Sequence, residues 1–88
     1  MKANAISIVI LSNGWVAVGR VSKKTGTYQV CDASVIRTWG TTRGLGEIAL
    51  NGPTEQTILD PCGEFDTPDS SVVFVIKCDG AKWKNALK

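Results

Sequence analysis

The fold of this chain is decided near its start, by the stretch AISIVILSNGWVAVGRVS at residues 5–22. Residues 5–12 form an apolar run rich in Ile, a residue type that favours strands. Asn13-Gly14 follows, and this pair is the strongest short signal for a β-hairpin because both residues tolerate positive φ. Residues 15–22 then return as a second strand whose side chains alternate between the two faces. The stretch therefore predicts an antiparallel strand pair.

Further segments extend this hairpin into a sheet. A turn at residues 23–26 leads to a predicted third strand at 27–31. Residues 34–39 fit either one helical turn or an extended piece, and their β-branched side chains favour a short strand. A brief strand is predicted at 57–59. The unbroken apolar run within residues 71–78 predicts the most buried strand of the chain.

The centre and the end of the chain have a different character. Residues 40–44 read as a loop, and the apolar positions that follow predict a short helix near 44–51. Asn51-Gly52-Pro53 ends this helix, since Asn or Gly takes the left-handed conformation and Pro prevents continuation. Residues 60–69 contain two Pro and one Gly and predict a polar loop. Residues 79–88 form a basic tail, in which Trp83 is a candidate anchor.

These elements define the expected fold class, a mainly β (α+β) protein. We expect a small antiparallel sheet or partly closed barrel of about five strands with one short helix, in a single domain over residues 1–88. The 43% of hydrophobic and 20% of charged residues exclude a disordered chain. The chain contains no His, which excludes a Ser-His-Asp triad and the commonest zinc ligand sets.

The cysteines and the apolar runs bear on the compartment. Cys31, Cys62 and Cys78 are odd in number and form no Cys-x-x-Cys motif, which favours reduced, half-buried thiols over a disulfide. Residues 2–11 alternate and are interrupted by polar side chains, so we expect no signal peptide there. No apolar run approaches the roughly 18 residues of a membrane span. The expected location is therefore the cytoplasm, without membrane contact.

Charge is distributed unevenly along the chain. Residues 44–76 contain acidic side chains and no basic one, whereas basic residues gather from Lys77 onward. Two interpretations remain open: a solvated acidic segment beside a solvated basic tail, or head-to-tail contact between copies. The net charge of +2 argues against nucleic acid as a partner.

The candidate binding site is the stretch RTWGTTRGLG at residues 37–46. Arginine side chains suit phosphate or carboxylate, and glycines let backbone N–H groups approach a ligand. The stretch runs into the start of the predicted helix, where free N–H groups attract anions. The tryptophan offers a flat face for a base. The predicted ligand-binding residues are Arg37, Trp39, Thr41, Thr42, Arg43 and Gly44.

A purely structural interpretation of the same stretch stays open. Thr42 or Gly44 could cap the helix, Trp39 could fill the core, and the arginines could pair with carboxylates elsewhere. The Gly-Lys-Ser/Thr ending of a Walker A loop is absent, and the glycine spacing differs from that of a Rossmann fingerprint. No carboxylate pair or calcium-loop pattern is recognisable, and Cys62 lacks an activating His. We therefore expect no catalytic residue, no metal and no cofactor.

Two stretches of the sequence are similar to those of a known group of proteins, namely ASVIRTWG at residues 33–40 and GLGEIALNGPT at 44–54. The chain resembles a family of small, largely uncharacterised proteins from tailed phages and prophages, over residues 7–83. Small β-rich phage proteins often counter host immunity. One group acts as sponges, which sequester the cyclic nucleotide or cyclic ADP-ribose signals of CBASS or Thoeris defence systems. The resemblance implies an anti-defence protein in the host cytoplasm but assigns no ligand residue.

The residues and the resemblance together predict a function and its alternatives. The first is sequestration of a nucleotide-derived immune signal, without cleavage, by a homo-oligomer whose pocket is shared between subunits. The second is a protein–protein inhibitor that blocks a host defence protein through Trp15, Trp83 or the acidic residues 55–69. The third is a small nucleic-acid-binding barrel that uses Trp39 and the basic tail.

Overall fold

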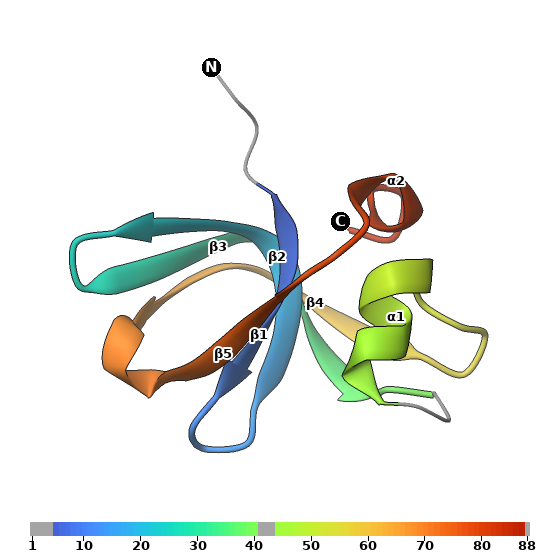
Figure 1. Ribbon diagram of the computed structural model, residues 1–88, viewed down its shortest axis with the longest axis horizontal. Coiled ribbons are helices and arrows are strands. Elements are labelled where there is room, and N and C mark those ends of the chain that lie inside the picture. Colours follow the sequence, from blue (N-terminus) through green and yellow to red (C-terminus); the bar gives the residue numbers. More distant parts are fainter. Residues whose placement is uncertain (1–4, 41–43, 88) are drawn as a thin grey trace.

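The computed structural model describes residues 5–40 and 44–87. Its centre is one antiparallel sheet of five strands in the order β4-β3-β2-β1-β5, with short helices at one end (Figure 1). The mainly β fold predicted from the sequence is confirmed, as an open sheet. In chain order the elements are β1 (Ile6–Leu11), β2 (Val16–Lys24), β3 (Thr27–Thr38), α1 (Leu45–Asn51), β4 (Ile58–Pro68), the 3-10 turn η1 (Asp69–Ser71), β5 (Val72–Lys77) and α2 (Gly80–Trp83).

The hairpin of β1 and β2 forms where the sequence predicts it. Ile8 lies opposite Val18 in the register, and both side chains are completely buried. Gly14 adopts a φ of 94°, and the side chain of Asn13 accepts a hydrogen bond of 3.2 Å from the N–H of Trp15. The turn therefore combines a left-handed glycine with an Asn side-chain contact.

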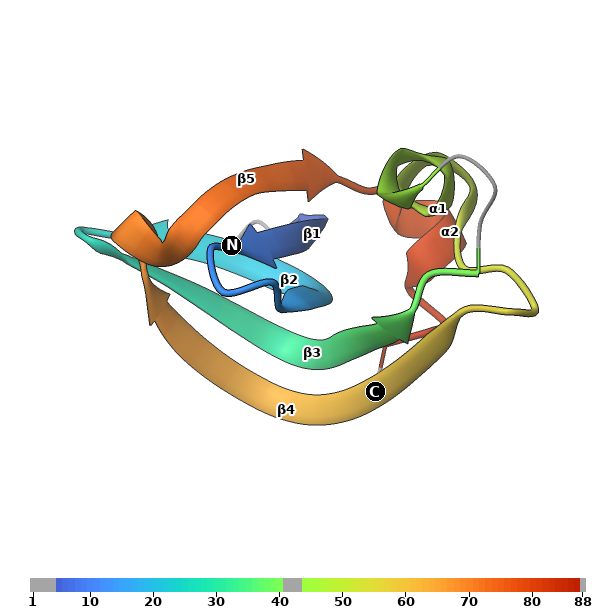
Figure 2. The same cartoon turned by 90° about the horizontal axis from the view of Figure 1, so that it is seen from below.

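Strand β3 settles the open question about residues 34–39, because the strand continues from Thr27 to Thr38. It contains a bulge at Asp32, which has a φ of 51°. The register shifts there against β4 and also shifts near Gly19 of β2. Such bulges bend a strand and increase its twist. The long strands β3 and β4 accordingly follow a curved path across the molecule (Figure 2).

Two expectations about the second half of the sheet are wrong. Residues 60–69 are not a polar loop, because β4 extends over most of them and pairs with β3. An edge strand tolerates proline because the missing N–H faces no partner, so Pro61 does not end the strand. The run at 71–78 is not the most buried strand: β5 lies at the other edge, where Val73 is 57% and Phe74 is 53% exposed.

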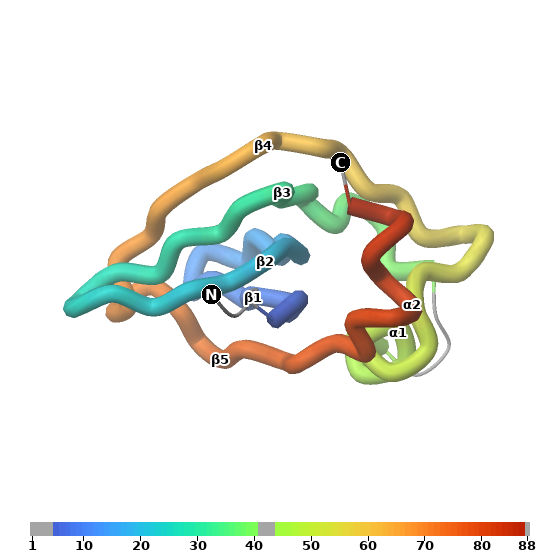
Figure 3. The backbone as a smooth tube through the Cα atoms, turned by 90° about the horizontal axis from the view of Figure 1, so that it is seen from above, coloured from blue at the N-terminus to red at the C-terminus, as the bar shows by residue number. Residues whose placement is uncertain are grey.

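The main core lies between one face of the sheet and the two helices, which pack side by side at one end (Figures 1 and 3). Trp83 of α2 is fully buried there, and its indole N–H donates to the carbonyl of Ile48 in α1 at 2.8 Å. A smaller cluster around Val9 and Val30 covers part of the other face. No helix in the described part of the chain is long and apolar enough to cross a membrane.

Candidate binding site

A pocket opens on the helix side of the sheet, between the β1–β2 hairpin, the edge strand β5 and the start of α1. We name it the Trp39 pocket; its volume is about 460 Å³. This volume lies within the usual range of roughly 300–1,000 Å³ for small-molecule sites. Its walls are predominantly apolar. The lining residues are Ile10, Gly14, Val16, Trp39, Leu45, Gly46, Phe74 and Ile76.

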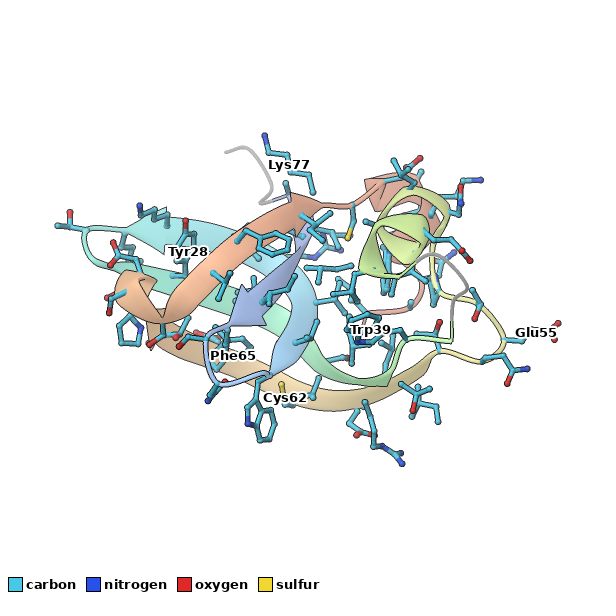
Figure 4. All side chains as sticks on the ribbon, turned by 60° about the horizontal axis from the view of Figure 1, so that its bottom comes forward. Tyr28, Trp39, Glu55, Cys62, Phe65 and Lys77 are labelled. Atoms are coloured by element: carbon cyan, nitrogen blue, oxygen red, sulfur yellow. The ribbon has the colours of Figure 1, made fainter. Side chains whose placement is uncertain are left out.

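The aromatic residues of this pocket come from separate parts of the chain. Trp39 follows the end of β3 and is 43% exposed, whereas Phe74 lies on β5 and is 53% exposed. Large aromatic side chains with open faces stack on flat ligands. Figure 4 shows Trp39 on the side of the sheet that carries α1, away from Cys62 and Phe65. The pocket thus offers aromatic surface from residues 35 positions apart in the sequence.

The backbone at Trp39 is held by two threonines, Thr54 and Thr57, which we call the threonine clamp. The hydroxyl of Thr57 donates to the carbonyl of Trp39 at 2.6 Å, and the hydroxyl of Thr54 donates to the carbonyl of Gly40 at 2.8 Å. The backbone N–H of Thr54 donates to the Thr57 hydroxyl at 2.9 Å. The segment before β4 therefore fixes the point at which the chain leaves β3 and places the indole at the pocket.

Only glycine fits at position 40, where the chain lies against the turn that carries the threonine clamp. Its φ is 68°, in the left-handed region, and a Cβ at this position would lie 2.4 Å from the carbonyl carbon of Gln56. Any side chain here therefore combines backbone strain with a clash against backbone atoms. The absence of a side chain lets the chain after Trp39 lie directly on the turn that carries the threonine clamp.

The structure brings only part of the predicted site together. Trp39 lines the pocket, and Gly44 immediately precedes α1, whose first residues also line it. Thr41, Thr42 and Arg43 lie outside the described residues. Arg37 follows the buried Ile36 on β3 and so points to the opposite face of the sheet.

Arg37 has a carboxylate partner on that opposite face. Its Nε donates to Asp60 at 2.9 Å and its Nη2 donates to the other carboxylate oxygen at 3.2 Å. The hydrogen bond to Asp60 and its negative charge raise the pKa of Arg37. The pair is exposed, so it contributes little stability. The structure thus favours the alternative that the sequence left open for Arg37, pairing with a carboxylate elsewhere in the chain.

A second pocket lies on the face of the sheet opposite the helices. We name it the Trp15 pocket; it has a volume of about 260 Å³ and is lined by Leu11, Trp15, Ala17, Val35, Cys62 and Phe65. Trp15 is 57% exposed. Trp83, which the sequence offered as another exposed contact residue, is buried instead and packs against α1.

The three cysteines are not in disulfide bonds, and the pKa values of two of their thiols are raised, which favours the neutral form. Burial raises the pKa of Cys78 to about 12. Burial and the neighbouring carboxylate of Glu64 raise the pKa of Cys31. A thiol with a raised pKa is a poor nucleophile near neutral pH. Within residues 5–40 and 44–87, no three His, Cys, Asp or Glu side chains gather where they could hold a metal ion.

Comparisons with known proteins add no assignment to this geometry. Neither the protein-family models nor the curated proteins that were compared with the chain gave a match. Inference about function therefore rests on the two pockets and on the residues that form them.

Proposed function

We propose that this chain is a non-catalytic binding protein and that the Trp39 pocket takes the flat aromatic part of a small ligand. The observation that carries the proposal is the apolar pocket with open aromatic side chains from β5 and from the end of β3. Purine bases have the shape and polarisability that stack on such side chains. The threonine clamp supports this role, because it holds the Trp39 backbone in place before a ligand arrives.

The ligand class we propose is a nucleotide-derived signal such as a cyclic nucleotide or a cyclic ADP-ribose isomer. In a phage protein, binding such a signal without cleaving it sequesters the signal from the host defence system that made it. The base enters the Trp39 pocket in this proposal. Arg37 takes no part, since its guanidinium faces the other side of the sheet and pairs with Asp60.

Calorimetry tests the proposal with a panel of cyclic mononucleotides, cyclic dinucleotides and cyclic ADP-ribose isomers. Trp39→Ala is expected to weaken binding by roughly 5- to 150-fold, the loss of one stacking contact of about 1–3 kcal/mol. Trp15→Ala is the matched control, because Trp15 is also an exposed tryptophan but lies on the opposite face. Arg37→Ala is expected to bind like the wild type. Silence across the panel refutes the ligand class, and loss of binding only in Trp15→Ala refutes the site.

A second candidate function rests on the Trp15 pocket. Trp15 and Phe65 form an apolar surface on the face away from the helices, and Phe65 belongs to the acidic strand β4. Exposed tryptophan in an apolar patch is typical of protein–protein contacts. A defence protein from the host that binds the wild type and Trp39→Ala but not Trp15→Ala favours this inhibitor function over signal binding.

A further inference from the structure

The two edges of the sheet differ in how they are protected against pairing with another strand. Edge strands commonly carry proline, charge or bulges that prevent such pairing. On β4, Pro61 and Pro68 remove backbone donors, and the register against β3 shifts at several points. Asp60, Glu64 and Asp66 add negative charge along the same strand. This edge is therefore well protected.

Strand β5 carries neither proline nor charge within the run from Val72 to Ile76, although its register against β1 shifts at Val73, between Val72 and Phe74. Its residues are all apolar, and the first charged side chain is Lys77 at the end of the strand. Val73 and Phe74 are each more than half exposed. Among the described strands, only β1 pairs with β5. The outer edge of β5 thus combines apolar side chains with backbone groups that no other strand of the described chain uses.

The register shows which backbone groups face outward. The N–H of Cys78 donates to the carbonyl of Ile6 at 2.9 Å, and Ile76 lies opposite Ile8 in the same register. Hydrogen-bonded and non-bonded residues alternate along an antiparallel strand. The N–H and C=O of Val75 and Lys77 therefore point away from β1, toward the free edge.

We propose that a second copy of this chain pairs with this edge, β5 against β5 in antiparallel orientation. A two-fold axis at Val75 places Val75 opposite the partner's Val75, so that both outward N–H groups and both outward C=O groups are used. Phe74 then lies opposite the partner's Ile76, an apolar pair on the helix side of the sheet. Lys77 lies opposite the partner's Val73, the residue at which the register of β5 shifts and the regular pairing ends. The two lysines are about 13 Å apart along the strands, which is beyond the Debye length of roughly 8 Å.

The choice of a second copy follows from this self-complementary pattern. The same strand supplies both sides, and no charged residue faces one of like charge. The pairing also concerns the Trp39 pocket, since Phe74 and Ile76 are at once its lining and the residues at the free edge. The partner's side chains extend that wall. In this respect the inference rests on the proposed function, but the pairing is measured without any ligand.

Sedimentation velocity over a concentration series tests the pairing. The wild type is expected to sediment as a dimer at the higher concentrations, and Val73→Lys as a monomer. Ile58→Lys is the matched control, since it places the same charge at a partly exposed apolar position on the protected edge. It is expected to behave like the wild type. A wild type that stays monomeric throughout overturns the inference and leaves ligand binding to be judged by calorimetry alone.

Disulfide trapping tests the register independently. In a Cys62→Ser background, Val75→Cys is expected to form a covalent dimer with oxidised glutathione, since opposite residues on paired strands lie within disulfide reach. Val73→Cys is expected to stay uncrosslinked, because Val73 and the partner's Val73 are about 13 Å apart along the strands. Trapping of Val73→Cys in place of Val75→Cys overturns the proposed two-fold axis. Circular dichroism of each variant confirms that the sheet is retained.

Discussion

The threonine clamp makes a prediction that connects the stability of the chain with its candidate site. Thr57→Val replaces a hydroxyl by a methyl group of nearly the same size, so the packing volume is kept. The change removes the bond that the hydroxyl donates to the Trp39 carbonyl at 2.6 Å. It also removes the acceptor for the N–H of Thr54 at 2.9 Å. The Trp39 carbonyl then loses its hydrogen bond to the segment before β4, and of the clamp's two bonds to the chain after β3 only the one from Thr54 to the carbonyl of Gly40 remains.

The magnitude follows from these contacts. An intramolecular hydrogen bond contributes a net stability of about 0.5–1.5 kcal/mol. The Thr54 N–H is half-buried, whereas the Trp39 carbonyl can reach water after the substitution. We therefore expect the free energy of unfolding to fall by about 1–2 kcal/mol. For a domain of this size that corresponds to a decrease in Tm of roughly 5–15 °C.

Urea unfolding followed by circular dichroism measures the difference in free energy. Thr38→Val is the matched control, because Thr38 is exposed at the end of β3 and makes no side-chain hydrogen bond to another described residue. Its change is expected to stay within about 0.5 kcal/mol. Equal stability of Thr57→Val and the wild type contradicts the role of the clamp. So does a ligand affinity that is unaffected in Thr57→Val but weakened in Trp39→Ala.

Three further predictions concern buried groups. Trp83→Phe should lower the free energy of unfolding by about 2–3 kcal/mol in urea titrations, because the hydrogen bond to Ile48 is lost and the smaller ring leaves a cavity. Ser34→Ala should leave that free energy unchanged or raise it by up to about 1 kcal/mol, because the buried hydroxyl has no partner among the described residues. The raised pKa of Cys78 means that the folded state holds its thiol proton more tightly than the unfolded chain, so stability is fully present below about pH 9 and decreases between about pH 9 and pH 12. A Cys78→Ala variant should show a smaller decrease in the free energy of unfolding over that pH range, as measured by urea titrations at a series of pH values.

The sequence predicts those parts of the fold in which the local signal and the tertiary environment agree. The Asn13-Gly14 turn and the helix that ends at Gly52 are examples, since each is set by residues close together in the chain. The second half of the sheet was predicted less well. Proline interrupts a strand only where its missing N–H would have to pair with a neighbouring strand. Pro61 is compatible with β4 because β4 lies at an edge of the sheet, and the sequence does not show that position. An apolar run such as β5 indicates burial, but its position in the sheet decides how much is exposed.

The candidate site, too, could be predicted only in part from the sequence. Trp39 could be singled out because it offers a flat face for a base within a stretch that also contains arginines and glycines. The direction of Arg37 could not be predicted, because residues 34–39 fitted both a strand and a helical turn, and these place the side chain on different faces. The threonine clamp was missed. The spacing of Thr54 and Thr57 indicates a local turn. The sequence around these threonines does not show that their partner is the backbone at Trp39, 18 residues away from Thr57.

The lining of the Trp39 pocket limits what one copy of the chain can bind tightly. Stacking of a base on an aromatic side chain contributes about 1–3 kcal/mol, which is roughly a 5- to 150-fold change in Kd. Tight sequestration of a nucleotide needs more than this, and apolar walls cannot distinguish one base from another by hydrogen bonds. The missing contacts have to come from outside the described lining. A partner that adds its own Phe74 and Ile76 enlarges the stacking surface, so the affinity of the wild type should exceed that of the monomeric Val73→Lys variant.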